Sequence, residues 1–365
     1  METTPEDSAA ISPATLNSRT AALMFCVEAA TCLGLVALAE TPWVKDAIRD
    51  AAWVQATWKK QIPWFSFTRE FLSNTDRLIY EELPATDFSR GGVYLVGASN
   101  VVWTVKLWDL SPEIRPWFHN IALGGGNQSD QFEMIRFLVE QRGLLEAGGP
   151  RTLMMFGVSY HSCHNARIPG RETSKIARSS WERHGIYSVD DDGTIRRTSC
   201  SPLYEAIVLE RHKMTGLMKE LVNLGYTPFK PVRVHNPKFS TGERTRDLGD
   251  EWRQKIDFEV ATFARTADYL RERGARVIVV RMPQPSWDHD SPFENAYIGG
   301  LRKVCQDRGI PVYDFSRLLT DDQFADSIHL TTEGMAEFGA KVVEIGVGHL
   351  RSIGALSPDQ PARNP

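Results

Sequence analysis

The chain has few cysteines and no excess of basic residues, and each shortage excludes a class of protein. Its five cysteines show neither CxxC spacing nor the density of a disulfide scaffold. Cys163 and Cys200 can pair in an oxidising compartment, with free buried thiols as the alternative. With 42 Lys and Arg against 46 Asp and Glu, the net charge of −4 gives no basic footprint for nucleic acid. We therefore expect a globular protein that does not bind nucleic acid.

Signatures of phosphate and metal binding are also missing. The glycine triplet Gly124–Gly126 is followed by Asn127, not by the Gly-Lys-Ser/Thr of a phosphate-binding loop. His161, Cys163 and His164 lie at positions i, i+2 and i+3, a spacing that fits no standard zinc pattern. We expect neither a metal nor another cofactor.

The first 89 residues differ in composition from the rest of the chain. Residues 1–18 are polar and predict a disordered tail. The apolar run 21–39 would form a helix about 28 Å long, so we predict a transmembrane anchor over 19–40. Glu28 in its middle costs about 2.5–3.5 kcal/mol on insertion, and an amphipathic helix packed on the domain is the alternative.

Residues 41–89 predict amphipathic or interfacial linker helices. In 42–60, Trp43, Val54 and Trp58 fall on one apolar arc of a helical wheel, opposite an arc of charged residues. Such a helix lies either in the headgroup layer of a membrane or on the core of its own protein. Residues 19–60 are therefore the predicted membrane-binding part of the chain.

From residue 90 to 355 the chain alternates predicted strands and helices. This alternation predicts an α/β domain with a mostly parallel sheet that is covered on both faces. The strands are expected at 93–96, 117–123, 152–156, 276–281 and 311–314, and the helices near 100–108, 129–146, 251–273, 292–308 and 332–346. The alternation breaks at about 161–250, which predicts an inserted lid or subdomain with a helix near 203–224. Residues 356–365 are expected to be a disordered tail.

Ser99 follows the first strand of this domain at a sharp turn. The run Val93–Val96 reads as a buried strand, Gly97 and Ala98 as a tight turn, and Ser99 as the start of a helix. This arrangement places a side chain at the carboxyl edge of the sheet, where open α/β folds bind ligands. Ser99 is either a helix N-cap or a nucleophile beside the N–H groups of the helix.

Two other segments predict chemistry at the same edge of the sheet. Asp326 and His329 are three residues apart before the last helix, so the carboxylate can orient the imidazole ring, although this pattern is also common at solvated helix starts. The glycine triplet 124–126 can expose backbone N–H groups to an oxyanion, or form a plain flexible turn. Serine, histidine and aspartate at one edge are the groups that a serine hydrolase requires.

Taken together, Gly97-Ala98-Ser99 and Asp326-x-x-His329 resemble the first and last blocks of the SGNH (GDSL-type) hydrolase superfamily. The resemblance implies a three-layer, flavodoxin-like fold with a five-stranded sheet and a catalytic triad of Ser99, His329 and Asp326. It also implies that Gly126 donates to the oxyanion. The third block, Gly-x-Asn-Asp, is replaced by Gly157-Val-Ser-Tyr, so either Ser159 or Asn165 supplies the side-chain donor, or the oxyanion hole is weaker.

With the predicted anchor, the chain looks most similar to membrane-anchored SGNH proteins that work beside membrane-bound O-acyltransferases on cell-surface polysaccharides. This resemblance implies an O-acetyltransferase or esterase that forms an acyl-Ser99 intermediate and acts on a glycan outside the cytoplasm. It implies a membrane-bound O-acyltransferase or a polysaccharide synthase as partner. The alternatives are a non-catalytic SGNH-fold scaffold or glycan-binding subunit, and a soluble lipase or esterase.

Overall fold

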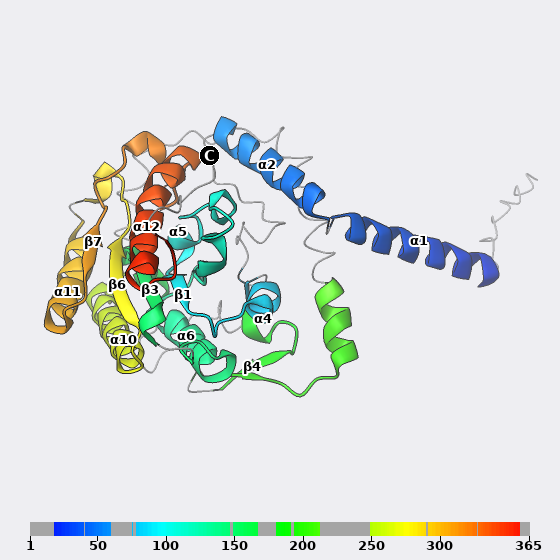
Figure 1. Cartoon of the computed structure of the whole chain (residues 1–365), viewed down its shortest axis with the longest axis horizontal. Coiled ribbons are helices and arrows are strands. Elements are labelled where there is room, and N and C mark those ends of the chain that lie inside the picture. The colour runs from blue at the N-terminus through cyan, green and yellow to red at the C-terminus, as the bar shows by residue number, and fades with distance from the viewer. Residues whose placement is uncertain are drawn as a thin grey trace, which may run out of the picture. The chain divides into compact units, whose positions relative to one another are not determined.

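The computed structural model describes residues 18–39, 41–59, 75, 78–146, 149–166, 180–190, 193–211, 249–289, 291–326 and 328–357. Within them, five parallel strands form a central sheet in the order β2-β1-β3-β6-β7 (Figure 1). The strands are β1 (Gly92–Val96), β2 (Phe118–Asn120), β3 (Thr152–Val158), β6 (Arg276–Arg281) and β7 (Val312–Asp314). The predicted parallel five-stranded sheet is confirmed.

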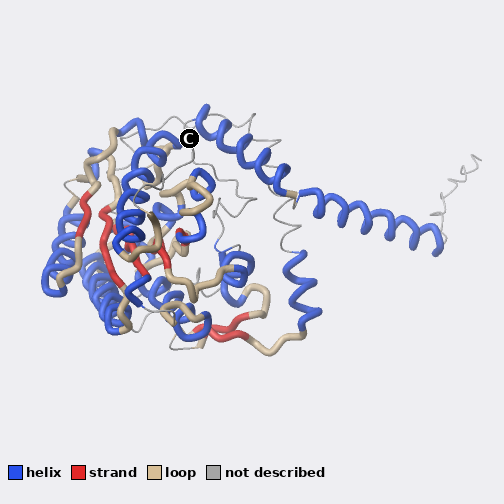
Figure 2. The backbone as a smooth tube through the Cα atoms, in the orientation of Figure 1, coloured by secondary structure: helices blue, strands red, loops and turns tan. Residues whose placement is uncertain are grey.

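Helices cover both faces of the sheet (Figures 1 and 2). On one face, α10 (Trp252–Glu272) packs between α6 (Gln128–Arg142) and α11 (Pro292–Arg308). Phe156 of β3 meets Phe263 of α10 there, with ring centroids 5.4 Å apart. Leu153 points to the opposite face, because side chains alternate along a strand, and lines a groove with Ile345 of α12 (Thr332–Ser352). The described domain therefore has three layers.

The predicted helix over 100–108 is wrong in length. Helix α5 spans only Ser99–Val102, and a separate 3₁₀ turn covers Leu107–Asp109. The Asn120 side chain ends α5, since its amide donates to the carbonyls of Val101 and Val102 at 3.3 and 3.0 Å. The nucleophile candidate thus lies on a very short helix.

The predicted insert contains a small antiparallel hairpin, β4 (Tyr187–Val189) with β5 (Ile195–Arg197). Tyr187 makes edge-on ring contacts with Trp181 at 5.1 Å and with Phe137 of α6 at 5.6 Å. The hairpin is therefore packed on the helical layer. A helix occupies 202–211, and the rest of the helix predicted at 203–224 lies outside the described residues.

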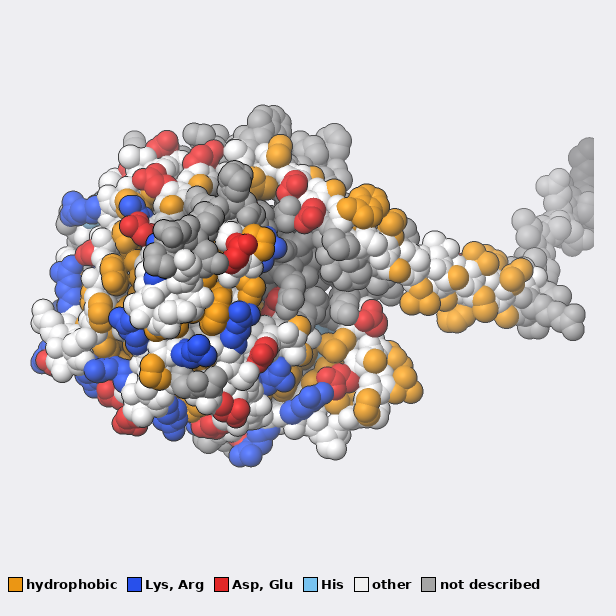
Figure 3. Space-filling model, in the orientation of Figure 1, with side chains coloured by type: hydrophobic (Ala, Val, Ile, Leu, Met, Phe, Trp, Pro, Cys, Tyr) orange, Lys and Arg blue, Asp and Glu red, His pale blue; other side chains and the backbone are white. Residues whose placement is uncertain are grey.

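The chain divides into two compact units, Met1–Ala47 and Ile48–Pro365. Helix α1 (Ser18–Ala39) carries many exposed apolar side chains, among them Leu23, Phe25 and Leu33, and hydrophobic atoms cover much of its visible face in Figure 3. In the part of the chain that the structure describes, no helix has the length and apolar character that crossing a membrane requires. The predicted anchor over 19–40 therefore finds no support. Residues 1–17 and 358–365, most of the two predicted tails, lie outside the described residues.

Helix α2 (Pro42–Lys59) contacts the core through a residue outside the predicted apolar arc. Trp43 and Val54, on the predicted apolar arc, are 66% and 67% exposed. Trp53 is packed against the core instead, with the Lys106 Nζ 4.1 Å from its ring centroid. The Thr57 hydroxyl is 2.8 Å from that of Thr332, at the start of α12. The second half of α2 is thus attached to the α/β domain.

Candidate active site

Ser99 is the first residue of α5, directly beyond the end of β1. Ala98 is the N-cap residue, and its carbonyl accepts from the N–H groups of Val101 and Val102 at 2.9 and 3.3 Å. Since Ala98 occupies the cap position, the interpretation of Ser99 as a helix cap is wrong. The Ser99 hydroxyl is free to face the edge of the sheet.

Two glycines allow α5 to lie this close to the sheet. A Cβ atom on Gly97 or Gly157, at the ends of β1 and β3, would meet the Val101 side chain closer than real Cβ contacts occur. Val101 is 2% exposed and fills the space that both glycines leave. The position of Ser99, two residues earlier on the same helix, therefore depends on this contact.

Asp326, His329 and Ser99 form a continuous hydrogen-bonded chain. Asp326 Oδ2 is 2.8 Å from His329 Nδ1, and His329 Nε2 is 2.9 Å from Ser99 Oγ. A carboxylate only accepts hydrogen bonds, so in the neutral imidazole Nδ1 carries the hydrogen and Nε2 accepts from the serine hydroxyl. The structure thus brings together the three residues predicted as a triad.

Asp326 and His329 lie before the start of α12 and are joined by backbone as well as side-chain hydrogen bonds. Asp326 Oδ1 accepts the N–H groups of Ile328 and His329 at 2.7 and 2.8 Å. Phe324 and Leu330 form an antiparallel bridge across the loop, and α12 begins only at Thr332. The imidazole is therefore held from both its ring and its backbone.

Asp326 and His329 differ in solvent exposure. The Asp326 side chain is 46% exposed, whereas His329 is 8% exposed over the whole residue. Burial raises the pKa of Asp326, but the hydrogen bond from His329, the attraction that its ring exerts when protonated, and the two backbone N–H groups together lower it below 3.8. Asp326 is thus ionised at neutral pH and able to stabilise an imidazolium ion.

The predictions for the three oxyanion-hole residues fare differently in the structure. The Gly126 N–H donates to the Leu123 carbonyl at 2.9 Å and closes a turn, so it is not available to an oxyanion in this conformation. This corrects the prediction for Gly126. Ser159 is placed beside the site, 4% exposed, at the end of β3. The Asn165 side chain lies outside the described part of the structure.

Two asparagines near Ser99 were missed by the sequence reasoning. Asn100 is 6% exposed, and its Nδ2 is 3.5 Å from Ser159 Oγ. Asn120 holds the end of α5 and also accepts the Ala122 N–H at 3.1 Å. Their positions directly after the serine and before the glycine triplet were the available signals.

The His161, Cys163 and His164 cluster is held in several internal contacts. His161 Nε2 is 3.3 Å from Asp288 Oδ2, and His164 Nδ1 is 3.1 Å from the His161 carbonyl. Cys163 is fully buried, which raises the pKa of its thiol. Cys163 and Cys200 are both free, so the pairing considered for them does not occur.

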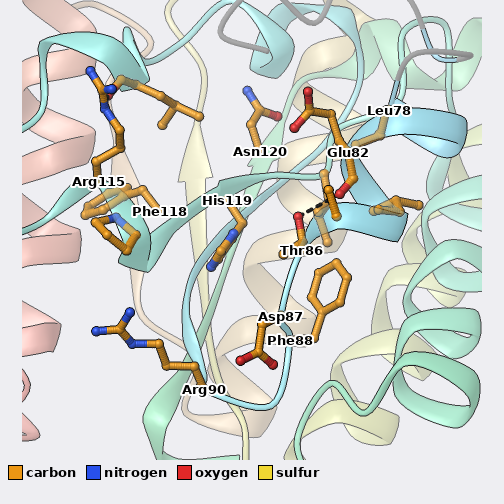
Figure 4. A pocket seen from close by; sticks show the side chains of 15 residues that line it. Leu78, Glu82, Thr86, Asp87, Phe88, Arg90, Arg115, Phe118, His119 and Asn120 are labelled. Atoms are coloured by element: carbon orange, nitrogen blue, oxygen red, sulfur yellow. Dashed lines mark hydrogen bonds between the residues drawn. The ribbon is translucent and has the colours of Figure 1, made fainter. Parts of the chain in front are cut away.

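A cavity of about 420 Å³ lies beside β2, away from the hydrogen-bonded chain (Figure 4). Phe118, His119 and Asn120 of β2 line one side, and Leu78 and Glu82 line the other. None of Ser99, Asp326 and His329 lines it. Asn120 lines this cavity and also contacts α5 through its amide.

No protein-family model and no curated protein matches the sequence. The fold is similar to that of a GDSL-like lipase from Bacteroides thetaiotaomicron, with a TM-score of 0.38 and 10% identity over 75% of this chain and 98% of that one. It is similar to an acetyl xylan esterase from the rumen bacterium Butyrivibrio proteoclasticus, with a TM-score of 0.31 and 9% identity over 73% of this chain and 65% of that one. Likeness at this level carries no conclusion about function, which has to rest on the site.

Proposed function

We propose that the protein is a serine acyl-transfer enzyme of the SGNH type in which Ser99 is the nucleophile. The observation that carries the proposal is the chain of hydrogen bonds from Asp326 through His329 to Ser99, at 2.8 and 2.9 Å. These distances lie in the range required for a nucleophile, its base and the group that orients the base. The order Ser, Asp, His along the sequence is that of several α/β hydrolases.

In the first half of the reaction, His329 Nε2 accepts the proton of Ser99 as Oγ attacks the carbonyl carbon of an ester. Asp326 stabilises the imidazolium that forms. The tetrahedral intermediate collapses, the bond to the leaving oxygen breaks, and His329 returns the proton to that oxygen. The product is an alcohol and an acyl-Ser99.

In the second half, the acyl group passes to water or to a sugar hydroxyl. His329 again takes the proton of the attacking oxygen and returns it to Ser99 Oγ. We propose a hydroxyl of a cell-surface polysaccharide as acceptor or ester substrate, and a membrane-bound O-acyltransferase or a polysaccharide synthase as partner. The support for the glycan, the partner and an extracytoplasmic location is the sequence resemblance alone.

The enzyme proposal is tested by trapping the acyl intermediate. The protein is mixed with 4-nitrophenyl acetate, quenched in acid, and measured by intact mass and peptide mapping. We expect one acetyl group on Ser99, none in Ser99→Ala, and wild-type labelling in Ser89→Ala, whose exposed hydroxyl only contacts Asp87. An unmodified Ser99 together with unchanged turnover in Ser99→Ala would exclude this nucleophile.

A scaffold or glycan-binding role is the second candidate. The Gly126 N–H bonded to Leu123 favours it, because a weak oxyanion hole gives slow acylation. The two functions differ in a Ser99→Ala strain, which loses polymer acetylation if Ser99 is a nucleophile and retains it if the protein only binds. Fractionation with and without detergent tests the proposed membrane location separately.

A further inference from the structure

The carboxamide of Asn100 is buried next to the nucleophile with most of its hydrogen-bonding capacity unused. Asn100 is 6% exposed, and its Oδ1 has no hydrogen-bond partner among the residues that the structure describes. Among the described residues its Nδ2 donates to one acceptor, Ser159 Oγ, at the long distance of 3.5 Å. A carboxamide offers two donor hydrogens and two acceptor lone pairs, and buried ones are normally satisfied.

The Asn100 side chain lies at the same edge of the sheet as the nucleophile. Ser99 follows β1 and Ser159 follows β3, and these two strands are neighbours in the sheet. Asn100 extends from the first turn of α5 toward the end of β3, while His329 reaches Ser99 from the loop before α12. The base and the carboxamide therefore come from different elements, the loop before α12 and helix α5.

The other candidate donors differ in how far they are already used. The Gly126 N–H donates to Leu123, as described above. Ser159 Oγ accepts the His161 N–H at 3.3 Å as well as the Asn100 amide, which leaves the Ser159 hydroxyl hydrogen as a second side-chain donor beside Asn100. The N–H groups of Ser99 and Asn100 make no backbone hydrogen bond in the described part of the chain, so they supply main-chain donors but no side-chain donor.

We propose that the Asn100 carboxamide is a substrate-binding group, whose N–H donates to the ester carbonyl oxygen as that oxygen becomes the oxyanion. Ser159 is then a positioning residue, which holds the carboxamide through the 3.5 Å contact until substrate arrives. The proposal rests on the proposed function, because it requires acylation of Ser99. It assigns to the residue after the nucleophile the donor that the sequence resemblance placed on Ser159 or Asn165.

The test compares acylation rates in Asn100→Ala, Asn100→Asp and a control. Ser129→Ala is the control, since Ser129 is 5% exposed, has an unpartnered hydroxyl and lies in α6. The burst of 4-nitrophenol from 4-nitrophenyl acetate gives the rate of acylation, and thermal unfolding reports the fold. We expect Asn100→Ala to lose about 10²–10³-fold in acylation rate, with little change in KM or in melting temperature, and the control to keep its rate.

Asn100→Asp adds a second measurement, the pH dependence of the acylation rate, which would not change if Asn100 had only a structural role. At neutral pH the carboxylate repels the forming oxyanion, so the loss is at least as large as in Asn100→Ala. As the pH falls toward the pKa of the new side chain, its protonated form can donate, and the ratio of variant to wild-type rate rises. A ratio independent of pH, together with a small loss in Asn100→Ala, overturns the proposal.

The outcomes separate this proposal from the one on which it rests. If the wild-type protein forms no acyl-Ser99, the proposed function fails and Asn100 has no oxyanion to bind. If the wild type is acylated and Asn100→Ala is acylated at the same rate, the function stands and the role of Asn100 is refuted. If Asn100→Ala unfolds, the isosteric Asn100→Asp variant and its pH profile decide.

Discussion

Because Gly157 lies so close to Val101, we expect Val101→Ala to rescue a Gly157→Ala variant. A methyl group at position 157 would overlap the Val101 side chain and lie 2.9 Å from Met282 Sδ. Gly157→Ala therefore has to push α5 away from the sheet. Because Ser99 is two residues from Val101 on this helix, we expect both the free energy of unfolding and the turnover to fall.

The magnitude follows from packing. Adding a methyl group to a filled core costs about 1–3 kcal/mol. Val101→Ala alone removes two methyl groups from a residue that is 2% exposed, at about 0.8 kcal/mol each before any cavity cost. In the double variant the new methyl group occupies the space that Val101 vacates. The double variant should therefore be more stable than the sum of the single changes by about 0.5–3 kcal/mol.

Gly97→Ala is the matched control for this experiment. Its Cβ would also meet Val101, but it would lie 2.8 Å from the Gly157 carbonyl oxygen as well. That oxygen belongs to the backbone, so Val101→Ala should not rescue Gly97→Ala. Urea unfolding and ester turnover of the five variants measure both effects. Strict additivity of Gly157→Ala and Val101→Ala in the free energy of unfolding would refute the packing argument.

Three other changes give separate tests. Asp326→Asn replaces the carboxylate that accepts the His329 Nδ1 hydrogen by a neutral carboxamide, and we expect kcat to fall about 10³–10⁴-fold. The pKa of Asp326 in the folded state lies below 3.8, so its contribution to stability is fully present above pH 3.8 and is lost as the pH falls through the folded pKa. Urea unfolding at several acid pH values should show this loss of stability in the wild type and not in the variant. Asn120→Ala frees the end of α5 and should lower the free energy of unfolding by about 1–3 kcal/mol in thermal or urea unfolding, with an unchanged value contradicting its role as a clamp. Burial and the charge of Arg276 lower the pKa of His349 below 6.5, so stability should decrease as the pH falls below 6.5 toward the folded pKa, and His349→Gln should flatten that part of the curve.

The strands and the long helices could be predicted because their patterns are local. The apolar run at Val93–Val96 and the sequence 276–281 form buried strands, as expected for parallel sheets. Helix α11 spans the predicted 292–308, with a proline at its start and Gly309 in the left-handed conformation at its end. In each of these elements the local signals agree with the tertiary structure.

The length of α5 could not be read from the sequence around it. Val101, Val102 and Val105 are β-branched and weaken a helix, and the amide of the distant Asn120 binds the carbonyls of Val101 and Val102 at its end. The face that α2 uses is a similar case. The helical wheel places Trp43 on the apolar arc, whereas Trp53 is the residue that packs against the core and Lys106. Contacts between remote segments determine both features.

The site was predictable to the extent that it depends on residue type and order. Serine, aspartate and histidine were identified by their positions after a strand and before the last helix. Whether the Gly126 N–H is already hydrogen-bonded depends on the conformation of one turn, and a run of three glycines does not determine that conformation. The buried state of Asn100 depends on the approach of β3, far away in sequence.

The contact between α2 and the start of α12 has a practical consequence for anyone who shortens the chain. Thr57 meets Thr332, which follows His329 by three residues, and Trp53 supports Lys106 beyond the end of α5. A protein trimmed at about residue 60 to improve expression would lose both supports, on the two segments that carry the histidine and the serine. Kinetic constants from such a fragment would describe a loosened site, and the full-length chain is the form in which rates and variants should be compared.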